Sequence, residues 1–361
     1  MMKKILIVTT WLPTQKNKTS GIFVERDIAA LSTIADVSVL HLVAPNLNDG
    51  IKRFKIGKAQ VERFEMNPKN PLHILKAVQK IQKLQTKVDL IHTIAVSASI
   101  PMAFINLKRP WIHTEHWSGF ISPDNESLHK KLIKKIIAVN LKRTRTTITV
   151  SKLLAEKINS YAQINTRVVP NIVDFPEKIS PQSERNTRIK IIGVGGMIPG
   201  KNPKLAIEIC AELQRRGLKL EFIWLGDGPL LSEMKNLAAE KLEHYSLPGS
   251  VSPEKVSSEL ATSDIFLVPT KGETFFLGAA EALAHGCPVV TGALGGHTDF
   301  VKPPYSECVQ DESIISYANA VERVLATTTG VTRAEIGKFV RENYSKSAFI
   351  SRMEQIYKEI S

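Results

Sequence analysis

Two glutamates separated by seven residues have the spacing in this sequence that most suggests chemistry. Glu273 follows the apolar run of residues 264–270, and Glu281 lies in a stretch that we expect to form a helix from near Leu277–Gly278. A helix N-terminus presents unpaired N–H groups and partial positive charge, which suit a phosphate or sugar oxygens. A carboxylate one turn further in can accept two hydrogen bonds from a vicinal diol, such as a ribose. By spacing alone, a solvated loop glutamate and a surface helix glutamate stay open as alternatives.

A glycine pair followed by a lysine is a second candidate for phosphate chemistry. Gly195 and Gly196 end the apolar run of residues 188–196, and Lys201 precedes the helix-like stretch 203–216. Glycines let the backbone approach a phosphate closely, and a positioned cation stabilises a leaving diphosphate as it gains negative charge. A tight turn without any ligand explains the glycine pair as well.

The segment HTEHWSGF (113–120) gathers polar side chains after the apolar residues PWI. The spacing of His113 and His116 is compatible with zinc, but a third ligand is not evident. A hydrolase would need a nucleophile, and Ser118 does not lie in a G-x-S-x-G elbow. A buried, hydrogen-bonded histidine is the structural alternative for both histidines. Trp117 suits stacking on a sugar and suits a place in the core equally well.

Short apolar, β-branched runs that alternate with helical patterns must position these residues. Continuous apolar strands separated by helices are typical of parallel sheets covered on both faces, and the pattern restarts midway, so we expect two doubly wound α/β halves in tandem. The runs are residues 4–10, 37–43, 88–94, 110–115 and 146–151 in the first half and 188–196, 218–226, 264–270 and 287–292 in the second.

The predicted domains follow from this repeat. Residues 1–172 form the first domain, the polar, proline-containing segment 173–187 links the two, and residues 188–339 form the second. Ligands of such sheets bind beyond the carboxyl ends of the strands. We therefore expect the site in a cleft between two facing sheets, and the candidate residues indeed come just after predicted strands.

The glutamate pair leading into EALAHGCPVV resembles the signature of the retaining glycosyltransferase family 4. Further segments resemble that family in the same order, so the similarity spans nearly the whole chain. These segments are SGIFVERDIAAL (20–31), TVSKLLAEKI (149–158), VVPNIVDF (168–175), GDGPL (226–230) and LPGSVSPEKVSSELATSDIFLVPT (247–270). The resemblance implies a GT-B fold, in which two Rossmann-like domains face each other across a cleft. The first domain would bind the acceptor and the second the donor, and the C-terminal helix, residues 340–361, would return to the first domain.

The same resemblance implies an activity. The chain would move a hexose-type sugar, with retention, from a nucleotide-diphosphate sugar to a glycan or lipid-linked acceptor in surface polysaccharide or cell-envelope synthesis. In the second domain, the resemblance implies that Glu273 contacts the sugar, Glu281 the ribose and Lys201 the diphosphate. We expect the backbone of Gly195 and Gly196 to approach the diphosphate as well. The backbone amides of Phe275, Phe276 and Leu277 would approach the sugar and the β-phosphate.

First-domain roles follow in the same way. His116 would contact the donor sugar or phosphate near the anomeric centre, and His113 would be structural. The loop that ends at Gly21 would bring backbone N–H groups near the diphosphate. Trp11 and Trp117 would border the acceptor.

Three departures from the family pattern change these expectations. Gly196 stands where an arginine is usual, so one of two cations is lost unless the backbone or Lys271 replaces it. Phe276 stands where glycine is frequent, and we expect its ring to narrow the donor pocket. In GGHTDF (295–300), Asp299 lies near the usual position of a glutamate.

Charge is concentrated in the first half. The net charge is +13, and residues 1–172 carry 27 Lys and Arg against 11 Asp and Glu, which leaves +16 there and −3 in the remainder. Residues 128–143 are amphipathic at helical spacing. The expected apolar arc holds Leu128, Leu132, Ile133, Ile136 and Ile137, and the expected polar arc holds Lys130, Lys131, Lys134, Lys135 and Lys142. Such a helix can lie on anionic membrane, and a helix packed on the sheet with its lysines in water gives the same pattern.

Other sequence features bear on the cofactor, the cellular location and the class of function. No D-x-D occurs, which predicts metal-independent transfer with UDP- or GDP-sugar as donor and no other cofactor. Three cysteines without C-x-x-C spacing favour a reducing cytoplasm, where the protein could also be peripheral on the inner face of the membrane. Alternative functions are a nucleotide-sugar epimerase or phosphorylase on the same fold and a catalytically degenerate binding subunit. Nucleic-acid binding would suit the charge, but no nucleic-acid module is recognisable.

Overall fold

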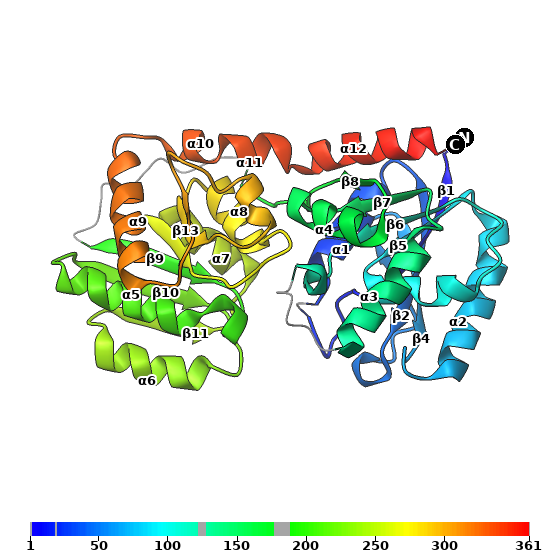
Figure 1. Ribbon diagram of the computed structural model, residues 1–361, viewed down its shortest axis with the longest axis horizontal. Coiled ribbons are helices and arrows are strands. Elements are labelled where there is room, and N and C mark those ends of the chain that lie inside the picture. The colour runs from blue at the N-terminus through cyan, green and yellow to red at the C-terminus, as the bar shows by residue number, and fades with distance from the viewer. Residues whose placement is uncertain (1, 19, 122–127, 177–187, 361) are drawn as a thin grey trace. The chain divides into compact units, whose positions relative to one another are not determined.

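The computed structural model describes residues 2–18, 20–121, 128–176 and 188–360, and in α3 the side chains of 134, 135 and 137–141. The chain divides into two compact units (Figure 1). Unit 1 comprises residues 1–172 and 346–361, and unit 2 comprises residues 173–345. Most of the expected linker, residues 177–187, lies outside the described residues.

Unit 1 is built on an eight-stranded sheet of order β3-β4-β2-β1-β5-β6-β7-β8, parallel except for the β3–β4 pair at its edge. Its strands are β1 (Lys4–Thr9), β2 (Asp36–Val43), β3 (Arg53–Ile56), β4 (Ala59–Glu65), β5 (Leu90–Ile94), β6 (Trp111–Glu115), β7 (Thr146–Thr149) and β8 (Thr166–Val168). β3, β4 and β8 lie outside the predicted runs. β4 (AQVERFE) mixes charged and apolar residues because it lies near the edge of the sheet, so it lacks the continuous apolar pattern of a central strand.

Helices cover both faces of this sheet. They are α1 (Ile22–Leu31), α2 (Pro71–Leu84), α3 (Leu128–Leu141), α4 (Lys152–Ala162) and α12 (Lys346–Glu359). Short 3₁₀ turns complete the unit: η1 (Pro45–Leu47), η2 (Gln85–Lys87), η3 (Val96–Ser99), η4 (Pro101–Phe104) and η5 (Ser118–Phe120). The two apolar clusters of the core contain residues of α1 and α12 in one case and of α2 in the other.

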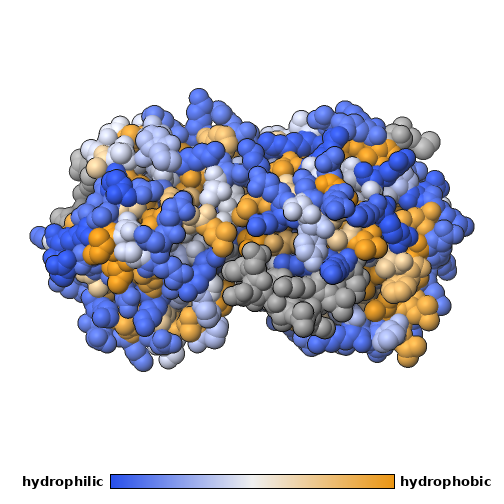
Figure 2. Space-filling view, in the orientation of Figure 1, coloured by the Kyte–Doolittle hydropathy of each residue, from blue (hydrophilic) through white to orange (hydrophobic). Residues whose placement is uncertain are grey.

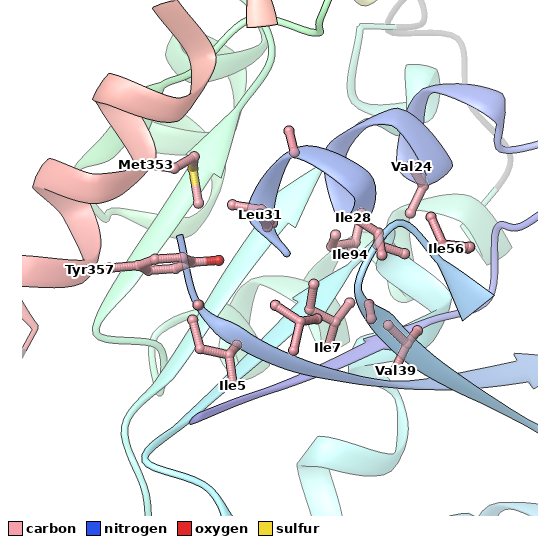
Figure 3. Packing of buried hydrophobic residues seen from close by; sticks show 14 of the residues in the cluster. Ile5, Ile7, Val24, Ile28, Leu31, Val39, Ile56, Ile94, Met353 and Tyr357 are labelled. Carbon is pink, nitrogen blue, oxygen red and sulfur yellow. The ribbon is translucent and has the colours of Figure 1, made fainter. Parts of the chain in front are cut away.

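The C-terminal helix α12 is an integral part of the unit 1 core. Phe349, Met353, Ile356 and Tyr357 are buried in the cluster that includes α1. Figure 3 shows Met353 and Tyr357 of α12 beside Leu31 of α1. The Lys3 ammonium group donates a hydrogen bond of 2.6 Å to the Tyr357 carbonyl oxygen, which joins α12 to the start of the chain.

Unit 2 is built on a six-stranded, fully parallel sheet of order β11-β10-β9-β12-β13-β14. Its strands are β9 (Ile189–Val194), β10 (Leu220–Leu225), β11 (Tyr245–Gly249), β12 (Ile265–Val268), β13 (Val289–Gly292) and β14 (Glu307–Val309). Its helices and turns are η6 (Pro199–Lys201), α5 (Pro203–Arg215), α6 (Leu231–Lys241), α7 (Pro253–Thr262), α8 (Leu277–Ala284), η7 (Gly296–Asp299), α9 (Ile314–Thr327), α10 (Arg333–Ile336) and α11 (Lys338–Asn343). Residues 340–345, which we expected to belong with the first domain, lie in unit 2.

Candidate active site

An ion pair in unit 2 joins two of the predicted site residues. Lys201 ends η6 beyond strand β9, and Glu273 follows strand β12. The Lys201 ammonium group pairs with Glu273 Oε1, and both side chains are largely buried, at 16% and 21% exposure. The Thr270 hydroxyl lies 3.1 Å from the Gly200 carbonyl oxygen and 3.3 Å from Glu273 Oε1, so it ties the two loops together. Thr270 is a supporting residue that sequence analysis missed.

The backbone of Glu273 is fixed by the loop after β13. The Glu273 N–H donates to the Leu294 carbonyl oxygen at 3.3 Å, and the Gly296 N–H donates to the Glu273 carbonyl oxygen at 2.8 Å. This loop continues into η7, which ends at Asp299. The pairing positions the carboxylate beside the edge of the sheet where strands β9 and β12 end.

His297 is a second residue of this site that sequence analysis missed. Its side chain is fully buried, and its Nε2 donates to the Gly292 carbonyl oxygen at 2.6 Å. Burial lowers the pKa of His297, so its imidazole is neutral at neutral pH. Nδ1 has no hydrogen-bond partner within the described part of the chain. The only signal in the sequence was its place directly after the glycine pair of GGHTDF.

Helix α8 begins directly behind the ion pair. Its N-cap, Phe276, has a φ of 69°, a left-handed conformation that is unusual for a bulky residue. The Phe276 ring is packed against Phe266 and His297, with centroids 5.7 and 5.6 Å away. The Lys201 ammonium nitrogen lies 4.0 Å from the Phe276 centroid, within cation–π range. We expected this ring to narrow the donor pocket, and in the structure it is buried beside Lys201.

The remaining predicted residues of the glutamate motif lie on or beside α8. Leu277 opens the helix, and Glu281 lies half-buried one turn in. Phe275 is buried against Phe300 and Tyr344, so only its backbone can serve a ligand. Because the first N–H groups of a helix lack partners within the helix, the start of α8 is suited to an anion.

The two adjacent glycines differ in whether a larger residue would fit in their place. Gly195 has a φ of +139°, and a Cβ atom there would lie 3.2 Å from the Lys201 side chain, so glycine is required. A Cβ atom at Gly196 would meet only ordinary contacts of 3.6 to 4.0 Å. Lys271 does not replace the missing arginine in this structure, because its ammonium group lies 3.3 Å from Glu312 in an exposed ion pair.

In unit 1, a buried carboxylate fixes the end of strand β6. Glu115 Oε1 accepts hydrogen bonds from the backbone N–H groups of His116 and Trp117, at 2.8 and 2.7 Å. Its Oε2 lies 3.1 Å from His113 Nε2, and His113 Nδ1 lies 2.7 Å from the Thr93 hydroxyl. His113 is therefore structural, as expected, and these contacts occupy both of its nitrogens. Glu115 orients the turn that carries His116, although sequence analysis gave it no role.

His116 lies in an aromatic environment. Its ring centroid is 4.6 Å from Phe23 and 6.4 Å from Trp11. Burial lowers the pKa of His116 to about 4, so the imidazole is neutral at neutral pH. Gly21, the N-cap of α1, has a φ of 75°, and a Cβ atom there would lie 2.5 Å from the Trp11 carbonyl carbon. Unit 1 thus gathers His116, Trp11 and the Gly21 loop.

Trp117 packs against its own loop, in agreement with the alternative of a place in the core. The Trp117 ring packs edge-on against Phe120 at 5.4 Å and lies directly over Gly119, which favours a packing role.

The expectation that Lys134 of helix α3 faces solvent was wrong. Lys134 is 7% exposed, and its ammonium nitrogen lies 5.8 Å from the Phe120 centroid. Lys135 is exposed as expected, whereas the side chains of residues 128–133 and 136 lie outside the described residues.

Comparisons with known proteins agree with this architecture. Residues 174–343 match the family described as glycosyl transferases group 1, and residues 36–175 match the family described as glycosyltransferase family 4. A 2-deoxystreptamine glucosyltransferase of Streptomyces kanamyceticus is 28% identical over 197 residues, which cover 50% of each chain. A UDP-Gal:alpha-D-GlcNAc-diphosphoundecaprenol alpha-1,3-galactosyltransferase of Escherichia coli is 24% identical over 319 residues, 83% of this chain and 78% of that protein.

Similarity extends to solved structures. The sucrose-phosphate synthase of Thermosynechococcus elongatus matches with a TM-score of 0.80 and 17% identity, over 99% of both chains. At that identity the likeness establishes the fold alone. The chain spans about half the length of the first curated relatives that it matches.

Proposed function

Because the chain belongs to the group 1 glycosyltransferases of family 4 and has the GT-B fold, we propose that it transfers a hexose-type sugar with retention. The donor would be a UDP- or GDP-linked sugar, and no metal ion would take part. The observation that carries the proposal is the Lys201–Glu273 ion pair, which lies at the carboxyl ends of β9 and β12 beside the start of α8.

The geometry of unit 2 supports a role for each group. Lys201 and the N-terminus of α8 would stabilise the negative charge that develops on the departing diphosphate. Glu273 neutralises Lys201 in the structure. When a diphosphate takes over the lysine, the carboxylate becomes available to accept hydrogen bonds from the sugar hydroxyls. Glu281 would accept hydrogen bonds from the ribose.

The proposed chemistry needs no covalent enzyme intermediate. The acceptor hydroxyl would attack the anomeric carbon from the face that the diphosphate leaves. The bond from that carbon to the phosphate oxygen breaks as the new glycosidic bond forms, and the leaving phosphate takes the hydroxyl proton. Neutral His116 would hold the sugar by a hydrogen bond, because its lowered pKa keeps it from carrying charge. The alternative function is a catalytically degenerate binding subunit. It is motivated by Gly196, which stands where a second cation would be expected.

A nucleotide screen tests the proposed donor site. We expect UDP or GDP to raise the melting temperature, because a ligand that binds only the folded state stabilises it by about 2.7 kcal/mol at 100 times its Kd. UMP and GMP are the matched controls, since they lack the β-phosphate that Lys201 would hold. No stabilisation by any nucleoside diphosphate would contradict the proposal, and binding without sugar transfer would favour the degenerate subunit.

Restoring the missing cation gives a second test. Gly196 has room for a side chain and no left-handed backbone, so Gly196→Arg is expected to fold. The guanidinium group should bind the diphosphate and improve kcat/KM about tenfold, within the range of a charged hydrogen bond. Gly196→Gln controls for bulk and should not improve it. A well-folded arginine variant with unchanged donor kinetics would show that the phosphate lies elsewhere.

The acceptor is proposed to be a glycan or a lipid-linked sugar at an anionic membrane surface. The Escherichia coli relative has a diphosphoundecaprenol-linked acceptor by its name. Residues 66–88 and 90–114 contain no acidic residue, and neither do residues 127–155. Elements from these ranges are hydrogen-bonded to each other. The Arg143 guanidinium group beyond α3 donates to the carbonyl oxygens of Met102 and Ile105, at 2.6 and 2.9 Å, and the Gln85 amide after α2 donates to the Asn106 carbonyl oxygen at 3.0 Å.

Large apolar side chains are exposed on the same elements. Leu72 and Leu75 of α2 are 66% and 52% exposed, and Phe104 of η4 and Val139 of α3 are each 68% exposed. Figure 2 shows apolar surface gathered over the part of unit 1 that carries α2. Exposed apolar side chains in segments that carry lysines and no acidic residue of their own suit the headgroup region of an anionic bilayer. No helix among the described residues is long and apolar enough to span a membrane.

Vesicle binding tests this contact. We expect the protein to sediment with vesicles of phosphatidylglycerol and phosphatidylcholine but not with vesicles of phosphatidylcholine alone. Leu72→Gln combined with Phe104→Ser should reduce binding about tenfold without loss of stability, because both side chains are mostly exposed. Ile315→Gln in unit 2, at a side chain 50% exposed, is the matched control. Equal binding to both vesicle types would argue against the proposal.

A further inference from the structure

A small cavity lies in unit 1 among five elements of its core, α1, β5, β6, β7 and α12. Its volume is about 10 Å³. Asp27 of α1 lines it, together with His92 of β5, Thr114 of β6 and His116 just beyond β6. The remaining wall is apolar and includes Phe349 and Met353 of α12. The lining of the cavity thus combines polar and apolar side chains.

No hydrogen bond or ion pair of the described residues explains why a carboxyl group is buried at Asp27. Its side chain is 3% exposed, and its Oδ1 atom has no hydrogen-bond partner in the described part of the chain. Burial raises the pKa of Asp27 well above its ordinary value, so the carboxyl group is neutral and carries a proton that it can donate. A buried polar atom without a partner is rare in folded proteins.

His116, which lines the same cavity, also has side-chain atoms without hydrogen-bond partners. Neither Nδ1 nor Nε2 has a hydrogen-bond partner among the residues described, and both atoms are buried. The aromatic contacts of the His116 ring fix its plane but do not select which nitrogen carries the proton. An imidazole that must hold a sugar hydroxyl requires one defined tautomer.

The other polar residues of the cavity are already paired with each other. His92 Nε2 lies 2.7 Å from the Thr114 hydroxyl, and His92 Nδ1 lies 3.0 Å from the Tyr357 hydroxyl of α12. Among the described residues that line the cavity, Asp27 and His116 therefore hold the side-chain atoms without partners. A volume of about 10 to 15 Å³ accommodates one water molecule, provided that two to four polar groups can bind it. The cavity has both the volume and the polar groups.

We propose that one water molecule binds in this cavity and bridges the Asp27 carboxyl group to a ring nitrogen of His116, which makes Asp27 a positioning residue for the imidazole. Asp27 donates its proton to the water, and the water bonds in turn to His116 and Thr114. One nitrogen of His116 is then committed to the water, and the other is left for a substrate hydroxyl, which reaches it when substrate binding exposes the buried ring. This role rests on the proposed function of His116. It also gives α12 a part in the site, because Phe349 and Met353 close the cavity that holds the water.

Substitutions at Asp27 separate positioning from packing. Asp27→Leu removes the polar group at similar volume, and because it replaces a buried group without a partner it should raise or preserve the melting temperature. It should nevertheless lower kcat about tenfold, with little change in donor KM, by analogy with the low end of the loss seen when a metal-bound histidine loses its outer hydrogen-bond partner. Asp27→Asn keeps a donor and should restore kcat to near the wild-type value. A stable leucine variant with wild-type kcat would overturn the proposal.

A spectroscopic measurement tests the bridge without relying on activity or on any variant of Asp27. In protein with ¹⁵N-labelled histidine, the His116 signals can be assigned by their loss in His116→Asn. We expect a single tautomer and a nuclear Overhauser effect from the ring to a long-lived water. A mixture of tautomers without a bound water would overturn the proposal, even if the leucine variant failed to fold. If wild-type protein showed the bridge but no transfer, the proposed function would fail while the water site stood.

Discussion

Replacing Lys201 by methionine is expected to lower kcat about 10²- to 10³-fold, the range for removing one preorganised group that stabilises transition-state charge. The Lys201 ammonium group is held by Glu273 on one side and by the Phe276 ring on the other. Its position is therefore fixed before the donor binds. Because no arginine stands at Gly196, the lysine should carry more of the diphosphate charge than it would as one of two cations. The measurement is steady-state transfer with the donor that the nucleotide screen identifies.

The matched control is Lys271→Met. Lys271 lies on the loop next to Glu273 in sequence, but its ammonium group pairs with Glu312 and is 50% exposed. We expect its removal to change kcat less than about threefold, since an exposed ion pair contributes at most about 1 kcal/mol. Equal losses in the two variants would mean that net positive charge, rather than a placed ammonium group, serves the reaction. A Lys201→Met enzyme with full activity would remove the central observation behind the proposed function.

The central strands and the glutamate motif were predictable from sequence because their signals are local. β12 is apolar at every position, and the helix after Glu273 begins at Leu277, where expected. The pairing of Lys201 with Glu273 could not be predicted from a local sequence signal. Residues so far apart in sequence meet only because β9 and β12 are neighbours in the sheet, and the resemblance to a family supplied that information.

The supporting residues could not be predicted because their roles depend on burial. Glu115 and His297 look like ordinary polar residues after a strand, and only the fold shows that each is enclosed and bonded to backbone. Lys134 fits a solvent-facing arc by periodicity, yet it is buried beside Phe120. Asp27 lies in an amphipathic helix where an acidic residue reads as surface, although its carboxyl group faces the core.

Substitutions at Glu273 and Glu281 are expected to change different kinetic parameters, so together they test the assigned roles most directly. Glu273→Gln removes the charge that holds Lys201 and weakens contacts to the sugar as its bond to phosphate breaks. We expect kcat to fall about 10²-fold with donor KM nearly unchanged, the pattern of an interaction made mainly in the transition state. Kinetics over a range of donor concentration provide the measurement.

Glu281→Gln should instead raise donor KM about tenfold and leave kcat nearly unchanged. Its ribose contacts would be equally strong in the ground state and the transition state, so their loss removes uniform binding. Glu281→Gln should keep the melting temperature of the wild type, because it replaces a half-buried carboxylate by an amide of the same shape. Glu273→Gln should lower the melting temperature, because the largely buried Lys201 ammonium group loses its ion-pair partner. Similar kcat losses in the two variants would contradict separate sugar and ribose roles. The reverse assignment, with kcat lost at Glu281 and KM at Glu273, would mean that the donor binds with its sugar toward the interior of α8.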